Sequence, residues 1–407
     1  MFEALAVIPE SALRKRWDKC RTFLAEVAPG AGGLLVFSRL SIYYLTGTMA
    51  QGVFWLPASG EPLLMVRKGL GRAALESSLD RVKAFKSYKD LAPLCAEAGV
   101  PLPDLVAAEM AGLSWQMGIM LADRLPGIRV VPGDQALALA MSLKSEWELQ
   151  LMRTCGALHH KALHDLLPER IRPNMTEREI SHAIWTLFFS LGHTGLMRMN
   201  AFGEEIFLGH VSAGDSGNYP STFNGPLGLR GEHPAAACMG NASRRWMPGQ
   251  PLACDVGFTL DGYVTDKTQV YWAGPAESIP MAVASAHSFC MDVQAMAAER
   301  LRPGAIPAQI YQEALFMANK AGFSEGFMGL GENKVPFLGH GIGLAVDGYP
   351  ALARGFDRPL EVGMVLALEP KQGVPGIGMV GVENTFEVTE AGGVCMTGDR
   401  FEIVCVE

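Results

Sequence analysis

The stretch from Pro251 to Trp272 reads PLACDVGFTLDGYVTDKTQVYW, and its two apolar runs flank the dipeptide Asp261-Gly262. That dipeptide is typical of a two-residue hairpin turn, because both turn positions need a positive φ. With the turn as centre, Asp266 lies opposite Gly257, and Asp255 points to the same face of the hairpin. Two carboxylates on one face repel each other unless a cation or a shared proton lies between them. The alternative is that both are ordinary surface acids on a solvated face.

A second hairpin is predicted from Gly363 to Val388, which reads GMVLALEPKQGVPGIGMVGVENTFEV and turns at Pro375-Gly376. Antiparallel pairing about this turn places Glu369 opposite Glu383, on a strand face that is otherwise small and apolar. Two facing glutamates are costly there unless they are ion-paired or bound to metal. A solvated sheet edge is the alternative.

The third motif is FLGHGIG, from Phe337 to Gly343, in which glycines flank His340 on both sides. We interpret these glycines as freeing the backbone for unusual angles and leaving the imidazole ring uncrowded. The spacing is not that of a phosphate-binding loop. Together the three motifs supply Asp, Asp, His, Glu and Glu in chain order, a hard, oxygen-rich set that suits two divalent cations.

The composition is that of a folded protein with no sign of nucleic-acid binding. The chain has 407 residues, which suggests two to three domains, and its 49% hydrophobic and 19% charged residues exclude wholesale disorder. The net charge of -8 argues against a nucleic-acid partner. None of the eight cysteines has C-x-x-C spacing, which argues against a zinc-binding or thioredoxin-like motif. We expect neither a signal peptide nor a membrane-spanning segment, because neither pattern occurs in the sequence. We therefore expect a cytoplasmic protein without a membrane partner.

Periodicity divides the chain near Ala140. Before it, a helix is predicted over 10–28 and strands over 33–37, 52–56, 62–66 and 130–131, which together favour an α/β domain over 1–140. After it, helices are predicted from Ser145, from the capping box Thr176–Glu179, and over 282–301 and 306–320. Strand patterns punctuated by glycine lie between and after these helices, so an α+β domain is expected over 141–407.

With these motifs in place, the sequence resembles the pita-bread metallopeptidases, a family that includes prolidases, Xaa-Pro aminopeptidases, methionine aminopeptidases and creatinases. SIYYLTG at 41–47 is similar to the creatinase-type N-terminal domain, and 141–153 is similar to the segment that opens the catalytic domain. The resemblance implies a creatinase-like α/β N-terminal domain, 1–140, and an α+β pita-bread catalytic domain, 141–407. Five positions match the family's metal ligands in type, order and local motif: Asp255, Asp266, His340, Glu369 and Glu383.

The resemblance implies a dinuclear metal-dependent hydrolase that cleaves short peptides, Xaa-Pro peptides among them, by a metal-bridged hydroxide. The five ligands would hold two divalent ions, manganese, cobalt, zinc or iron, and Glu369 would also act as general base and acid. Prolidase-like members have an upstream pocket histidine, for which His233 in RGEHPA is the candidate and His210 in LGHVSAG the rival. A homodimer is implied as well.

Two positions depart from the family pattern. Asp347 stands seven residues after His340, where peptidases of the family carry a substrate-contacting histidine, and Gly381 stands where proline-specific members carry arginine. Asp347 could bind a substrate ammonium, act as a base in substrate handling, or pair with Arg354. The alternative function therefore keeps the fold but changes the reaction, to a lyase acting on dimethylsulfoniopropionate or to a hydrolase of a small amide or guanidino compound. A non-catalytic binding module is disfavoured, because all five ligands are present.

Overall fold

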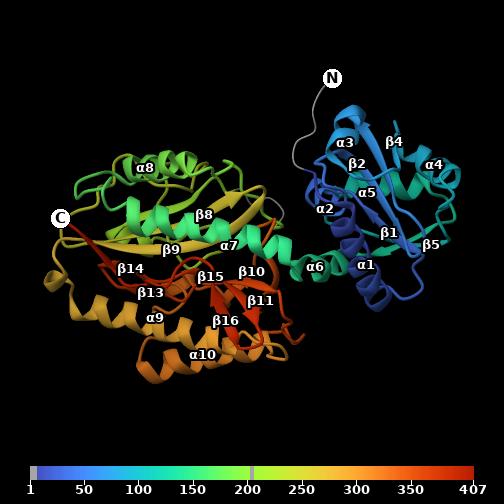
Figure 1. Ribbon diagram of the computed structural model, residues 1–407. Helices are drawn as coiled ribbons and strands as arrows, with labels where there is room; N and C mark the ends of the chain where they lie inside the picture. Colours follow the sequence, from blue (N-terminus) through green and yellow to red (C-terminus); the bar gives the residue numbers. More distant parts are fainter. Residues whose placement is uncertain (1–6, 202–205) are drawn as a thin grey trace. The chain divides into compact units, whose positions relative to one another are not determined.

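The computed structural model describes residues 7–201 and 206–407, and the chain divides into two compact units, Met1–Met141 and Ser142–Glu407 (Figure 1). The boundary expected after residue 140 lies one residue before this division.

The N-terminal unit is a six-stranded mixed sheet, ordered β4-β3-β2-β1-β5-β6, with helices packed against it. The strands predicted at 33–37, 52–56 and 62–66 are present as β1, β2 and β3, and the helix predicted over 10–28 is α1. The strands are β1 Gly33–Val36, β2 Gln51–Pro57, β3 Leu63–Lys68, β4 Val82–Ala84, β5 Leu105–Ala108 and β6 Arg129–Pro132. The helices are α1 Glu10–Val27, α2 Arg39–Thr46, α3 Leu70–Glu76, α4 Leu91–Glu97, α5 Trp115–Arg124 and α6 Asp134–Ser142.

The second unit contains a four-stranded sheet, ordered β17-β9-β8-β7, a five-stranded sheet, ordered β11-β10-β12-β15-β16, and the two-stranded ladder β13-β14. Helices α7 and α8 pack on the first sheet, whereas α9 contacts β13, β14 and β16 and α10 contacts β10 and β11. The helices are α7 Glu146–His160, α8 Glu177–Ser190, α9 Met281–Arg300 and α10 Pro307–Ala321. The strands are β7 Gly209–Ala213, β8 Pro251–Leu260, β9 Tyr263–Ala273, β10 Phe337–Gly341, β11 Gly348–Ala353, β12 Val365–Leu368, β13 Lys371–Val374, β14 Gly378–Gly381, β15 Asn384–Thr389, β16 Gly392–Cys395 and β17 Val404–Val406.

The first predicted hairpin and the predicted helix cap are both present. Strands β8 and β9 pair with Gly257 opposite Asp266, as the turn chemistry predicted. Asp261 and Gly262 have φ values of 48° and 86°, the left-handed conformation that this turn needs. At the start of α8, Glu179 N donates to the Thr176 hydroxyl at 3.1 Å and Thr176 N donates to Glu179 at 2.8 Å.

The second predicted hairpin has the expected register but is not one continuous ladder. Leu368 pairs with Asn384 in β12–β15, and Lys371 pairs with Gly381 in β13–β14. Between these ladders, Glu369 N donates to Leu338 O at 3.0 Å, and Glu383 O accepts from Thr268 N at 3.1 Å. Pro370 has no N–H to continue the pairing, so the two glutamates lie where the ladder is interrupted.

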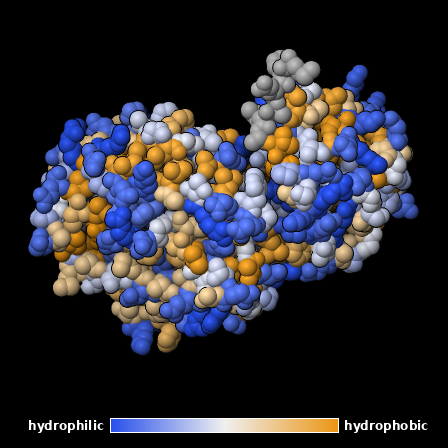
Figure 2. All heavy atoms as spheres, viewed as in Figure 1, coloured by the Kyte–Doolittle hydropathy of each residue, from blue (hydrophilic) through white to orange (hydrophobic). Residues whose placement is uncertain are grey.

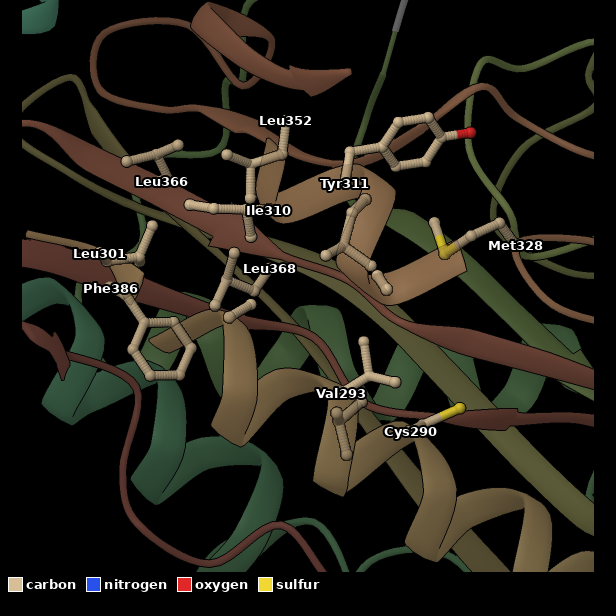
Figure 3. Packing of buried hydrophobic residues seen from close by; sticks show 14 of the residues in the cluster. Cys290, Val293, Leu301, Ile310, Tyr311, Met328, Leu352, Leu366, Leu368 and Phe386 are labelled. Atoms are coloured by element: carbon tan, nitrogen blue, oxygen red, sulfur yellow. The ribbon is translucent and has the colours of Figure 1, made fainter. Parts of the chain in front are cut away.

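A hydrophobic core holds β12 in place just before Glu369. Figure 3 shows side chains of α9 and α10 packed against Leu366, Leu368 and Phe386, all of which are buried. Each fully buried side chain of this kind contributes roughly 1.5–3 kcal/mol relative to an exposed one. The strand that leads into the site is therefore rigidly supported from the side opposite the carboxylates.

Hydrophilic and hydrophobic residues share the visible surface of both units (Figure 2). Figure 2 shows hydrophilic residues over much of the visible face of each unit, with smaller hydrophobic groups among them. Within residues 7–201 and 206–407, no helix combines the length and the apolar character that a bilayer crossing demands.

Buried histidine makes the stability of the second unit depend on pH. His193 is 4% exposed, its Nδ1 accepts from Thr259 N at 3.0 Å, and burial lowers its pKa to about 4. Because the unfolded chain binds the proton more readily, this contribution is complete above the unfolded pKa near 6.5 and is lost as the pH falls towards 4. We expect His193→Asn, whose amide oxygen can replace Nδ1, to lose about 2 kcal/mol less stability than the parent between pH 7 and pH 5. Urea unfolding at the two pH values measures this difference, and equal losses for the two proteins would contradict it.

Candidate metal centre

The five predicted ligands are brought together around one cavity of about 180 Å³. They come from five places in the second unit: Asp255 on β8, Asp266 on β9, His340 on β10, Glu369 just after β12 and Glu383 just before β15. The cavity is smaller than the roughly 300–1,000 Å³ of pockets for drug-sized ligands. The arrangement therefore suits a small substrate.

The glycines beside His340 have a different role from the one expected. Neither Gly339 nor Gly341 adopts a positive φ, so the backbone angles are ordinary for a strand. Instead, a Cβ at Gly339 would collide with the carbonyl oxygen of Ala367, and a Cβ at Gly341 with that of Tyr349. The glycines let β10 approach β12 and β11 closely, and this close approach places the His340 ring beside the carboxylates.

One side of the cavity has the chemistry of a divalent-cation site. Ligand atoms of Asp266, His340 and Glu383 all lie within 4.8 Å of one another. His340 Nε2 is 3.4 Å from Glu369 Oε1 and 3.8 Å from Glu383 Oε1. Two or three carboxylates with one imidazole suit Mn²⁺, Fe²⁺, Co²⁺ or Zn²⁺. These residues fit the ion that the sequence predicts there.

A buried cation that the sequence analysis missed contacts three of the carboxylates that line the cavity. Lys371, on β13, is only 1% exposed, and its Nζ lies 2.6 Å from Glu383 Oε2. The same Nζ is 3.3 Å from Asp255 Oδ2 and 3.3 Å from Glu369 Oε2. The signal was present in the motif EPK, because strand alternation places Lys371 on the face of Glu369.

Burial and mutual charge shift the pKa values of the groups in this cluster. Burial opposes the charged form of Lys371, but Asp255, Glu383 and Glu369 together raise its pKa well above the ordinary value. Burial also opposes ionisation of Asp255, but the Lys371 ammonium holds the pKa of that carboxyl below its usual range. On the opposite side, burial and then the Asp255 carboxylate raise the pKa of Asp266 to about 7. Lys371 also favours the charged forms of Glu369 and Glu383, but burial, together with the neighbouring carboxylates, outweighs it and raises the pKa of both.

The histidine at the cavity is His210 and not His233. His233 is exposed and lies on a short turn, where its Nδ1 accepts from Ala235 N at 3.1 Å. His210, paired with Asp255 across β7 and β8, is among the described residues that line the cavity. Its Nε2 is buried without a hydrogen-bond partner among residues 7–201 and 206–407, and burial lowers its pKa. A neutral imidazole nitrogen is thus available at the cavity for a ligand.

Asp347 lines the cavity, but its carboxylate is engaged by the backbone. Oδ1 accepts from Asn200 N at 2.5 Å and Oδ2 accepts from Ala201 N at 2.7 Å. The Asn200 side chain in turn donates to Asp347 O at 3.0 Å. The pairing with Arg354 that was considered is therefore replaced by two backbone contacts. Asp347 positions the segment at 200–201 beside the cavity.

Gly381 shows why an arginine is absent at this position. Its φ is 132°, and an added Cβ would collide with Pro370 O and lie 2.7 Å from Lys371 Cα. Since Gly381 is the strand partner of Lys371, a side chain here would push the two strands apart. The cationic side chain in this part of the site comes from the opposite strand, at Lys371.

Removing the Asp347 carboxylate distinguishes positioning from catalysis. We expect Asp347→Ala to raise KM roughly 10-fold with a much smaller change in kcat, because two charged hydrogen bonds that order 200–201 are lost. A reacting base would give the opposite pattern, with kcat falling roughly 10²-fold or more. Steady-state kinetics on a cleaved peptide separates the two outcomes.

A buried cluster of four carboxylates and one imidazole, set beside a small cavity between two sheets, defines a metal-dependent hydrolase centre. The chain belongs to metallopeptidase family M24, whose model matches residues 150–390. The creatinase/prolidase N-terminal domain model matches residues 16–140. Together the two matches follow the division into two units.

Known proteins match most of the chain. A probable dipeptidase PepE of Mycobacterium bovis is 28% identical over 392 residues, which cover 93% of this chain and 92% of the relative. An Xaa-Pro dipeptidase of Pyrococcus furiosus is 21% identical over 96% of this chain and 100% of its own. Among solved structures, the Xaa-Pro dipeptidase from Bacillus anthracis has a TM-score of 0.78 at 18% identity, covering 97% of this chain and 100% of its own. The dipeptidase PepE from Mycobacterium ulcerans has a TM-score of 0.77 at 24% identity, covering 98% and 100%.

Proposed function

We propose that the protein is a metal-dependent hydrolase that cleaves short peptides. The observation that carries this proposal is the convergence of Asp266, His340 and Glu383 beside Glu369 in one cavity of about 180 Å³. A divalent ion held by these residues would polarise a carbonyl group and lower the pKa of water. Membership of family M24 and the dipeptidase relatives support the same reaction.

The side chains around the cavity have distinct tasks in this reaction. Glu369, whose Oε1 faces His340 across 3.4 Å, takes a proton from the attacking water and passes it to the leaving amine. Lys371 holds the other oxygen of the same carboxylate at 3.3 Å and so fixes its orientation. His210 Nε2 is buried and has no partner in the described part of the chain, so it is a hydrogen-bonding group for the substrate.

The lyase alternative is weaker, because it needs Asp347 as a proton-abstracting base. Both oxygens of that carboxylate accept backbone N–H groups, at 2.5 Å and 2.7 Å. Both oxygens are therefore already engaged in holding residues 200–201. Asp347 therefore suits a positioning role better than abstraction of a proton from carbon.

A substrate screen tests the proposal. The Mn²⁺-loaded protein is incubated with dipeptides and short peptides, including an Xaa-Pro series, and released amino acids are measured by mass spectrometry. We expect cleavage of at least one peptide, and none after chelation of the metal. Release of dimethyl sulfide from dimethylsulfoniopropionate without cleavage of any peptide would overturn the peptidase proposal in favour of the lyase.

A further inference from the structure

The two glutamates of the site each direct their two oxygens to different partners, the His340 ring on one side and the Lys371 ammonium on the other. Glu383 Oε1 faces His340 Nε2 at 3.8 Å, whereas its Oε2 lies 2.6 Å from Lys371 Nζ. The two oxygens of Glu369 have the same two partners: Oε1 is 3.4 Å from His340 Nε2, and Oε2 is 3.3 Å from Lys371 Nζ. A carboxylate that bridges two cations uses one oxygen for each, and here the second position holds an ammonium.

Lys371 takes up the oxygens that a second metal ion would need. Asp255 Oδ2, at 3.3 Å, completes a set of three carboxylates around Nζ. Divalent cations bind carboxylate oxygens at about 2.0–2.6 Å, so an ion between these oxygens would lie against the ammonium. The metal ion and the Lys371 ammonium are both positive, and two positive charges in direct contact repel each other strongly in a buried site. The residues on this side of the cavity do not fit a second metal ion.

The ammonium is held in this position by its own strand. Lys371 O accepts from Met328 N at 2.9 Å, and Lys371 pairs with Gly381, which has no side chain to displace it. The lysine side chain is 1% exposed, so the ammonium is shielded from solvent. Moving a charged group away from its carboxylate partners into apolar surroundings is strongly unfavourable.

We propose that the centre is mononuclear, with one exchangeable divalent ion bound by Asp266, His340 and Glu383, and with the Lys371 ammonium fixed in place of the second ion. This inference rests on the proposed metal dependence of the protein and replaces the two ions expected from the family resemblance. If all four carboxylates are ionised, their formal charge is -4; one divalent ion and Lys371 together supply +3, which balances most of it.

Metal stoichiometry tests the proposal independently of activity. The full chain is stripped of metal, titrated with Mn²⁺ in a calorimeter, desalted and analysed for bound manganese, with the electron paramagnetic resonance spectrum as a second readout. We expect close to one ion per chain and the spectrum of a magnetically isolated Mn²⁺. We expect Lys371→Ala to bind close to two ions and to give the spectrum of a spin-coupled pair.

Two control variants test whether a second ion in Lys371→Ala results from loss of the ammonium or from a general structural change. Lys371→Arg keeps the positive charge and is expected to remain at one ion. Lys267→Met removes the other lysine that is fully buried among the described residues, whose Nζ contacts Asn384 Oδ1 at 2.7 Å. It is also expected to remain at one ion.

Each outcome decides the proposal. Two ions in the parent protein, or none, would overturn it, even if Lys371→Ala failed to fold. A folded Lys371→Ala protein that stays at one ion would overturn the role of Lys371. If the parent protein binds two ions and cleaves a peptide, the proposed function stands and the mononuclear centre is wrong. If it binds one ion and cleaves no peptide, the mononuclear centre stands and the proposed function is wrong.

Discussion

Glu369→Gln is expected to lower kcat for peptide cleavage by roughly 10²–10⁴-fold, the usual contribution of a general base and acid. Glutamine keeps the shape of the side chain and an oxygen for Lys371 Nζ, now 3.3 Å from Glu369 Oε2. It cannot accept and return the proton, so the loss falls on the chemical step. Steady-state kinetics with the Mn²⁺-loaded protein measures the change in kcat.

Two controls make the Glu369 result specific. Glu390→Gln makes the same chemical change at an exposed turn between β15 and β16, and its kcat is expected to match the parent. Mn²⁺ binding by Glu369→Gln should persist, because Asp266, His340 and Glu383 remain. A variant that binds Mn²⁺ and still turns over at the parent rate would remove Glu369 from the proton transfer.

Lys371→Met is expected to destabilise the metal-free protein by about 3–5 kcal/mol, the usual cost of leaving buried charges without their partner. The substitution keeps the side chain's length but leaves the carboxylates of Asp255, Glu369 and Glu383 facing one another. Saturating Mn²⁺ should restore much of the loss, because an ion that binds only the folded state stabilises it. Urea unfolding with EDTA and with Mn²⁺ measures both effects.

The matched control for this prediction is Lys267→Met. Lys267 is equally buried, but its Nζ donates to the amide oxygen of Asn384, which also accepts from Thr397 Oγ1 at 3.0 Å. The Lys267→Met substitution leaves a neutral amide, not a carboxylate, without its partner. The change in the free energy of unfolding should therefore be smaller and should not depend on Mn²⁺. Equal unfolding free energies for Lys371→Met and the parent in EDTA would show that the lysine does not neutralise the three acids.

Local patterns predicted most of the fold, because turn and cap chemistry act over a few residues. The Asp261-Gly262 turn determines the β8–β9 register, and the Thr176 capping box determines the start of α8. The interruption of the second hairpin was not predicted. Pro370 signals that a hydrogen bond is missing, but the neighbours that replace the ladder, Leu338 and Thr268, come from distant strands.

The candidate site was predicted as far as sequence order and strand faces allow. The five predicted ligands line one cavity. The choice of the pocket histidine and the role of Lys371 could be determined only from the structure. His210 and His233 are both upstream histidines, and only the pairing of β7 with β8 places His210 beside Asp255. Lys371 was overlooked because a lysine in a sequence is normally a surface residue.

The fixed ammonium changes how the site depends on its surroundings. A dissolved ion leaves when its concentration falls or when a chelator competes for it, in proportion to mass action. The Lys371 ammonium is covalently part of the chain, so it cannot dissociate, be removed by a chelator or be replaced by another metal ion. Activity would then rise with free metal along a simple saturation curve governed by a single binding step. During metal shortage, the Asp255 side of the centre would keep its counter-charge and its shape.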